Sequence, residues 1–126
     1  MKDKKSFAIV LQGEDRLIGS AGLMNYDGIN RTAELGVSIG EAADRSKGYG
    51  LETVKLILRF GFDALNLNSV VLRVFEFNVG AIKCYERAGF VKSGVRRQAY
   101  YAKGKYYDQI YMDILREEWL KLNGNN

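Results

Sequence analysis

Hydrophobic residues near the start of the chain lie in short stretches that are separated by glycines and polar residues. The stretches at 6–11, 16–26 and 32–39 each have the length and composition of a strand. Only a few polar residues separate the first two stretches, which predicts a β-hairpin. Gly19 and Gly22 lie inside the second strand, where we expect them to mark β-bulges.

The middle of the chain changes to a helical period. Between 49 and 65, apolar residues recur at intervals of three and four, at positions 51, 54, 58, 62 and 65. This spacing predicts an amphipathic helix with one apolar face. A second helix is predicted over 79–88, because Asn78 can cap its start and Gly89 can end it. Between the two helices, the Val- and Phe-rich stretch 69–77 predicts another strand.

The remainder of the chain predicts a long hairpin and a short helix. Two strands, 90–102 and 105–115, meet at Lys103-Gly104, and a helix over 116–122 follows with Trp119 on its apolar side. The order βββ-α-β-α-ββ predicts a mixed α/β fold, in which helices pack on one mixed sheet. A chain of 126 residues suits a single domain, 1–126.

Composition removes several classes of chemistry. The chain has no histidine, which excludes His-based catalytic triads and most zinc sites, so we expect no metal. Cys84 is the only cysteine, so no internal disulfide can form, as is usual in a reducing compartment. No apolar run is long enough to span a membrane. We therefore expect a cytoplasmic protein, whose net charge of +4 mildly favours anionic ligands.

The stretch Arg45-Ser46-Lys47-Gly48-Tyr49-Gly50 lies where a loop becomes the first helix. The first turn of a helix has unpaired N–H groups and the positive end of the helix dipole. Glycines at this point let an anion approach the backbone, and two basic residues add charge, so the stretch is a candidate phosphate site. A solvated turn ahead of a helix remains the alternative. The pattern is neither a Walker loop nor a complete dinucleotide fingerprint.

Four stretches together resemble the Gcn5-related N-acetyltransferases. They are the strand at 33–40, the loop at 45–50, the segment 78–90 with its Asn, Ala-Ile, Tyr and Gly-Phe, and the ending 94–119. The ending resembles the branch that holds spermidine and ribosomal-protein N-terminal acetyltransferases. The resemblance implies an acyl-CoA N-acyltransferase fold in which strands 32–39 and 69–77 splay apart. It also implies that the family's usual first strand and first two helices are missing.

The resemblance implies a site for acetyl-CoA, used as a co-substrate, between the two splayed strands. Backbone groups of the first strand would pair with the pantetheine arm, near Val37, Ser38 and Ile39. The pyrophosphate would lie on the loop and first helical turn, at Arg45, Ser46, Lys47, Gly48, Tyr49, Gly50 and Leu51. Further contacts to the coenzyme arm would come from the second helix, from Asn78, Ala81 and Tyr85.

The residues permit a mechanism. Asn78 and Tyr85 are seven positions apart, about two helical turns, so both can face one groove. A tyrosine with a pKa of about 10 is protonated at neutral pH and can act as the acid for a departing CoA thiolate. The amine must lose a proton before it attacks, and without histidine Glu34 is the best-placed candidate base, directly or through water. An amine that enters the site already neutral needs no strong base. The alternative for each residue is a structural role: Tyr85 would be a core residue, Glu34 a surface charge and Asn78 a helix cap. We expect Cys84 to be a packed thiol and not a nucleophile.

Three functions compete. The first is an N-acetyltransferase for a primary amine: a polyamine, a peptide N-terminus or another small amine. The second is a catalytically weak CoA-binding or regulatory module, because the acceptor half of the family's fold is incomplete. The third is a single-strand nucleic-acid platform built from basic residues interleaved with tyrosines. This last pattern is more often an exposed strand face, so we expect no nucleic-acid partner. An uncovered sheet edge leads us to expect a homodimer.

Overall fold

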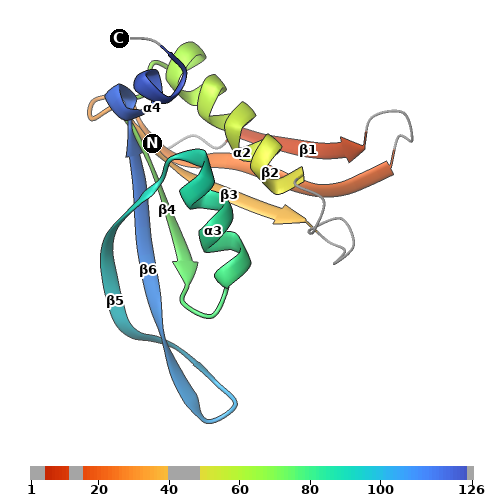
Figure 1. The fold of residues 1–126 in the computed structure, drawn as a ribbon, viewed down its shortest axis with the longest axis vertical. Coiled ribbons are helices and arrows are strands. Elements are labelled where there is room, and N and C mark those ends of the chain that lie inside the picture. Colours follow the sequence, from red (N-terminus) through yellow and green to blue (C-terminus); the bar gives the residue numbers. More distant parts are fainter. Residues whose placement is uncertain (1–4, 12–15, 40–48, 125–126) are drawn as a thin grey trace.

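The computed structural model describes residues 5–11, 16–39 and 49–124, and they form one sheet with helices on it (Figure 1). The strands are β1 (Lys5–Leu11), β2 (Arg16–Asp27), β3 (Thr32–Ile39), β4 (Ser69–Phe75), β5 (Val91–Ala102) and β6 (Lys105–Leu115). The helices are α2 (Tyr49–Arg59), the π-helical η1 (Phe60–Ala64), α3 (Val79–Ala88) and α4 (Arg116–Leu122). The sheet has the order β1-β2-β3-β4-β6-β5. Only β3 and β4 pair in parallel, so the predicted mixed sheet is confirmed.

The predicted element order is also confirmed, with two corrections. The strand predicted over 69–77 ends at Phe75, because the chain then turns and Asn78 N–H donates to the Phe75 carbonyl at 2.9 Å. The helix predicted over 49–65 is α-helical only to Arg59. It continues as a π-helical turn, in which Leu65 N–H donates to the Phe60 carbonyl at 3.1 Å.

One of the two predicted bulges is confirmed. The pairing of β1 with β2 shifts between Ile9 and Val10, opposite Gly19 and its neighbours. Gly22 instead pairs regularly with strands on both sides, so the bulge expected there is wrong. The second irregularity of β2 comes later, between Met24 and Asp27, where Asn25 has a φ of 56°. This twist of the backbone matters for the site described below.

The two faces of the sheet differ. On one face, alternate residues of β3, β4 and β6 point into the core beneath α2 and α3. The buried sheet residues there are Ala33, Leu35, Val70, Leu72, Val74, Met112 and Ile114. The predicted apolar face of α2 and η1 completes this core through Val54, Leu58 and Phe62. Phe62 stacks on the buried Trp119 of α4, with ring centroids 5.1 Å apart.

The parallel strands β3 and β4 pair over three positions only. Thr32 lies opposite Ser69, and the pairing ends where Glu34 meets Val71. Beyond this point β3 follows β2 and β4 follows β6, and Figure 1 shows the two strands running apart. The predicted splay is therefore confirmed. In the part of the chain that the structure describes, each of the two strands has one edge with no strand beside it past the end of this pairing.

None of the helices formed by the described residues is long and apolar enough to cross a membrane.

Candidate functional site

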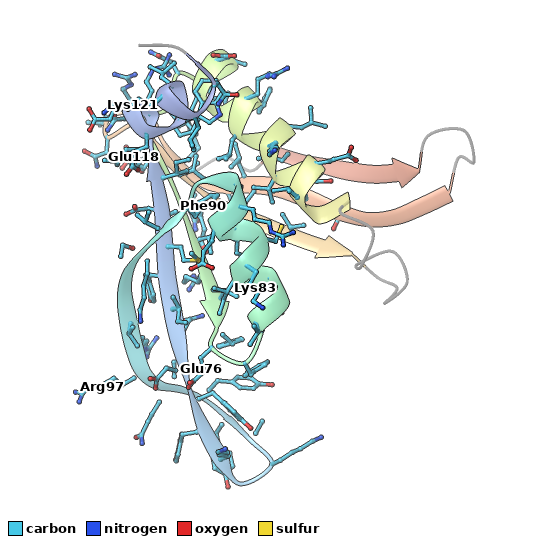
Figure 2. All side chains as sticks on the ribbon, in the orientation of Figure 1. Glu76, Lys83, Phe90, Arg97, Glu118 and Lys121 are labelled. Atoms are coloured by element: carbon cyan, nitrogen blue, oxygen red, sulfur yellow. The ribbon has the colours of Figure 1, made fainter. Side chains whose placement is uncertain are left out.

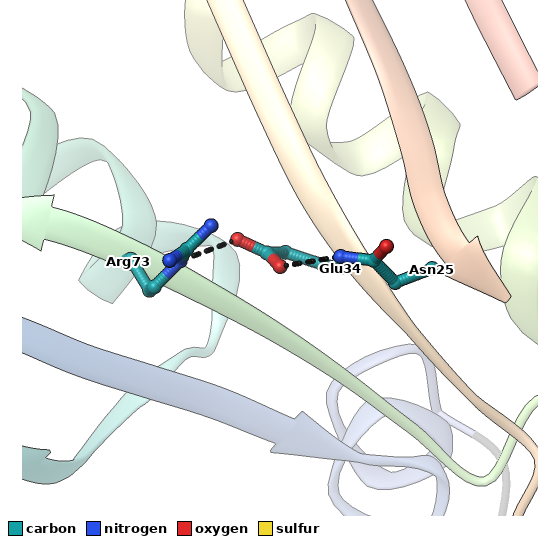
Figure 3. A network of polar contacts seen from close by, with 3 residues as sticks. All are labelled: Asn25, Glu34 and Arg73. Carbon is teal, nitrogen blue, oxygen red and sulfur yellow. Dashed lines mark hydrogen bonds and ion pairs between the residues drawn. The ribbon is translucent and has the colours of Figure 1, made fainter. Parts of the chain in front are cut away.

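Glu34 lies at the apex of the splay, in the last position where β3 pairs with β4. Its carboxylate is 15% exposed and lies on the sheet face opposite the helices, because Ala33 and Leu35 point into the core. Arg73 Nε of β4 donates to Glu34 Oε2 at 2.8 Å, and Asn25 Nδ2 of β2 donates to Glu34 Oε1 at 3.0 Å (Figure 3). Glu34 thus joins three strands and is not an isolated surface charge.

The same network raises the pKa of Arg73. The largest cause is its hydrogen bond to Glu34, followed by the charge of that carboxylate, and Tyr111 contributes a smaller part. Each oxygen of the Glu34 carboxylate therefore already accepts one hydrogen bond from a neighbouring strand. A proton or a water molecule can use only the lone pairs that remain.

Tyr85 lies on α3, on the face of the helix that packs against the core. Its ring meets Phe90 edge-on, with centroids 5.9 Å apart. The end of α3 is fixed beside it, since Phe90 N–H donates to the Tyr85 carbonyl at 3.0 Å and Gly89 has the left-handed φ of 110°. Burial raises the pKa of the Tyr85 hydroxyl, with a smaller effect from Cys84. Tyr85 is therefore a neutral proton donor at physiological pH.

Asn78 precedes α3 in the N-cap position, but its side chain makes no capping hydrogen bond. Its backbone carbonyl accepts from Ile82 N–H at 3.1 Å, so the helix begins here without help from the carboxamide. The alternative reading of Asn78 as a side-chain cap is wrong. The exposed carboxamide remains available to a ligand, and Ala81 and Tyr85 follow it on α3.

The other predicted coenzyme contacts are only partly described. Ser38 and Ile39 form the end of β3, where they pair with Ser20 and Gly19 of β2, and the preceding Val37 packs against the core. Tyr49 and Gly50 begin α2, and α2 contacts both β3 and α3. Leu51 is partly buried against the core. Arg45, Ser46, Lys47 and Gly48 lie outside the described residues.

Sequence reasoning missed Arg73 and Asn25. A signal for Arg73 was present, because it is the one charged residue within a mostly apolar strand. Asn25 had no such signal, since its position depends on the irregular backbone of β2. Cys84 is a partly buried free thiol whose pKa is raised chiefly by burial, as expected for a packed cysteine. The described residues contain no group of three or more carboxylate, thiol or imidazole side chains that could hold a metal.

Comparison with known proteins gives one family. The family described as "Acetyltransferase (GNAT) domain" matches residues 1–91. An uncharacterized N-acetyltransferase, p20, of Bacillus licheniformis is 32% identical over 113 residues, which are 90% of this chain and 63% of that protein. A putative ribosomal N-acetyltransferase of Bacillus subtilis is 31% identical over 82% of this chain and 56% of its own length. The spermidine N(1)-acetyltransferase of Vibrio cholerae is 30% identical over 89% of this chain and 64% of its own length.

Solved structures agree with these relatives. The spermidine N-acetyltransferase from Vibrio cholerae, solved in complex with CoA and spermine, superposes with a TM-score of 0.84. It is 29% identical, and the match covers 93% of this chain and 68% of that chain. The chain therefore spans between about half and two thirds of the length of the relatives named above.

Proposed function

Because this chain belongs to the GNAT family of acetyltransferases, we propose that it transfers an acetyl group from acetyl-CoA to a primary amine. The observation that carries this proposal is the splay of β3 and β4, which leaves two unpaired strand edges beyond Glu34 and Val71. A relative with the same fold was solved with CoA and spermine, which supports the same pair of ligands here. We further propose that residues 1–126 act as one domain.

The coenzyme fits the residues around the splay. The open edge of β3, up to Val37, Ser38 and Ile39, offers backbone groups to the amides of the pantetheine arm, as a neighbouring strand would. The first turn of α2 offers N–H groups to the pyrophosphate, and the sequence 45–51 around its start carries two glycines and two basic residues suited to an anion. The carboxamide of Asn78 is free of a capping role and can bind the arm. Acetyl-CoA supplies the reactive thioester.

The proposed chemistry uses the two faces of the sheet. The amine nitrogen attacks the thioester carbonyl, a C–N bond forms, and the C–S bond breaks to release the thiolate. Tyr85 gives its hydroxyl proton to that thiolate, which its raised pKa permits across the physiological range. Glu34 lies on the face without α2 and α3, so the amine approaches from there. Because both Glu34 oxygens are already bonded, we propose that it takes the amine proton through a water.

Polyamines are the first acceptors to test, because a relative is a spermidine N(1)-acetyltransferase. Peptide N-termini follow, because another relative is a putative ribosomal N-acetyltransferase. A second candidate function is a CoA-binding or regulatory module with weak catalysis, because both oxygens of Glu34, the proposed base, already accept hydrogen bonds. Turnover of spermidine or an N-terminal peptide, measured as release of CoA, separates the two functions.

Binding is tested separately, by thermal unfolding with acetyl-CoA. A ligand at a hundred times its dissociation constant adds about 2.7 kcal/mol of stability if it binds only the native state. We expect a clear rise in the melting temperature, and a smaller rise when Arg45 and Lys47 are both changed to Glu. No rise at millimolar acetyl-CoA would contradict both candidate functions.

The proposal extends to the compartment and the oligomeric state of the protein. We infer a cytoplasmic protein, because its single cysteine suits a reducing compartment. We also infer a homodimer, because β1 and β5 are the edge strands of the sheet and a second copy can cover one of them. A monomer in light scattering contradicts the dimer.

We infer no nucleic-acid partner, because the tyrosines of the β5–β6 hairpin pack on other aromatic rings. Tyr100 and Tyr107 have centroids 5.8 Å and 5.0 Å from that of Phe77.

A further inference from the structure

A pocket of about 220 Å³ lies between α2, α3 and α4. Its wall is formed by the buried side chains of Leu58, Ala88 and Trp119, and three basic side chains line it as well, Lys55, Arg59 and Arg87. The pocket is at the opposite end of the sheet from the splay. β6 ends where Leu115 pairs with Ser69, so α4 begins beside the paired end of β4.

The apolar wall is built from fixed parts. Gly89 packs directly against α4, since a Cβ atom there would overlap Leu122 Cδ1. Arg116 Nη1 donates to the Leu67 carbonyl at 3.2 Å, and Trp119 stacks on Phe62. At the start of α4, the Glu118 carboxylate accepts from Leu115 N–H at 2.9 Å. The first three contacts hold α4 against η1, the segment after η1 and the end of α3, and so position the apolar wall of the pocket.

All the charged side chains that line this pocket are positive. Lys55 and Arg59 are one helical turn apart on α2, and Arg87 faces them from the last turn of α3. No carboxylate side chain lines the pocket, and none of these three cations forms an ion pair with another of the described residues. All three cations are exposed at the mouth of the pocket, and an anion placed between them would be attracted to each.

We propose that this pocket binds a small phosphorylated molecule. Its phosphate dianion is held by Arg59, Arg87 and Lys55, and its organic part rests on Leu58 and Trp119. Guanidinium groups bind phosphate oxygens in pairs, and the ammonium of Lys55 adds a point charge. At about 220 Å³ the pocket leaves room for an organic part beside a phosphate group. Such a ligand would join the three helices that cover the core.

The experiment uses the single tryptophan of the chain as its reporter. The indole N–H signal of Trp119 is followed by NMR while phenyl phosphate, inorganic phosphate or phenol is added at constant ionic strength. Saturating acetyl-CoA is present throughout, so that the coenzyme site is filled. We expect a saturable shift with phenyl phosphate, binding at least about fivefold weaker for inorganic phosphate, and no saturable shift with phenol.

Matched variants locate the site. Arg59→Gln with Arg87→Gln should weaken phenyl phosphate about tenfold or more, because two charge-assisted contacts are lost. Lys83→Gln with Lys121→Gln removes the same charge from exposed positions of α3 and α4 outside the pocket (Figure 2) and should change affinity less than about twofold.

Three results overturn the proposal: no saturable shift at millimolar phenyl phosphate, an equal loss in both double variants, or equal affinity for phenyl phosphate and inorganic phosphate. The last would mean an adventitious ion only.

Discussion

The two faces of the sheet have opposite character, although the same strands make both. Towards α2 and α3, the alternate residues of β3, β4 and β6 are buried and apolar. On the other face, the same strands present Glu34, Arg73, Tyr111 and Asp113, which are charged or polar and only partly buried or exposed. The first face supplies the free energy of folding, and the second supplies the chemistry of the proposed acceptor side.

The comparison teaches where each kind of mutation should act. A change on the helix-covered face should lower stability, with activity following only because less protein is folded. A change on the other face should leave the fold almost intact and act on catalysis. Tyr85 is the exception, because it stands on the covered side and is proposed to reach the coenzyme. A mutation of Tyr85 can therefore show whether its effect on stability and its effect on catalysis are separate.

The largest effect should come from Phe62→Ala. Phe62 is fully buried and stacks on Trp119, so its removal leaves a cavity between η1 and α4. We expect a loss of about 3–5 kcal/mol in the free energy of unfolding, measured by chemical denaturation. Leu56→Ala is the matched control, because Leu56 is on α2 but 64% exposed, and it should cost less than about 1 kcal/mol. Similar losses for both would contradict the described core.

Tyr85→Phe comes next and should act on rate rather than on stability. Removing the hydroxyl leaves the ring against Phe90 but takes away the proposed proton donor. We expect kcat to fall by at least about a hundredfold, with acetyl-CoA affinity and melting temperature nearly unchanged. Steady-state kinetics and acetyl-CoA titration measure the two effects. Full activity in this variant would remove Tyr85 from the mechanism.

A smaller effect on stability is expected from Arg73→Gln. The Arg73–Glu34 pair is partly exposed, so its loss should cost no more than about 1 kcal/mol, and less in high salt. A double-mutant cycle with Glu34→Gln isolates the coupling between the two side chains. Activity should fall in both single variants, because the carboxylate at the apex loses its orientation or its charge. Normal activity in both would place the network outside the reaction.

The smallest effect concerns Asp113 and depends on pH. Burial, and secondarily the charge of Glu118, raise the pKa of Asp113 above its usual 3.8. The folded state therefore holds this proton more tightly than the unfolded chain, and stability falls as pH rises from about 3.8 through the raised pKa.

Asp113→Asn should accordingly raise stability at neutral pH, by less than about 1 kcal/mol, and the gain should vanish below pH 3.8. Denaturation at several pH values measures it. Asp63→Asn is the control for net charge, because Asp63 is exposed on η1. A gain that persists unchanged at low pH would mean that the carboxyl group is not its source.

Most of the fold could be predicted from local patterns. The period of three and four along α2, the alternation of β5 and β6, and the turn at Lys103-Gly104 are properties of neighbouring residues. Both turn residues have positive φ, at 51° and 77°, as a tight hairpin turn requires. The splay was expected only from the family resemblance, because it depends on where two strands 30 or more residues apart stop pairing.

The site was harder to predict for the same reason. The contact of Glu34 with Arg73 requires the register of β3 on β4, and that with Asn25 requires an irregular turn of β2. The pocket likewise combines Lys55 and Arg59 with Arg87, which lies on another helix. Such constellations depend on tertiary packing, so hydrophobic period and spacing carry no signal for them.

The central claim is that acetyl-CoA binds between the splayed strands, and hydrogen exchange tests it most directly. Backbone amides of β3 beyond Glu34 have no partner on their open edge, and those at the start of α2 are unpaired helix-end groups. We predict that acetyl-CoA slows exchange at 35–39 and 45–51 and leaves the β5–β6 hairpin unchanged. Tight binding of acetyl-CoA without protection of these two segments would contradict the account.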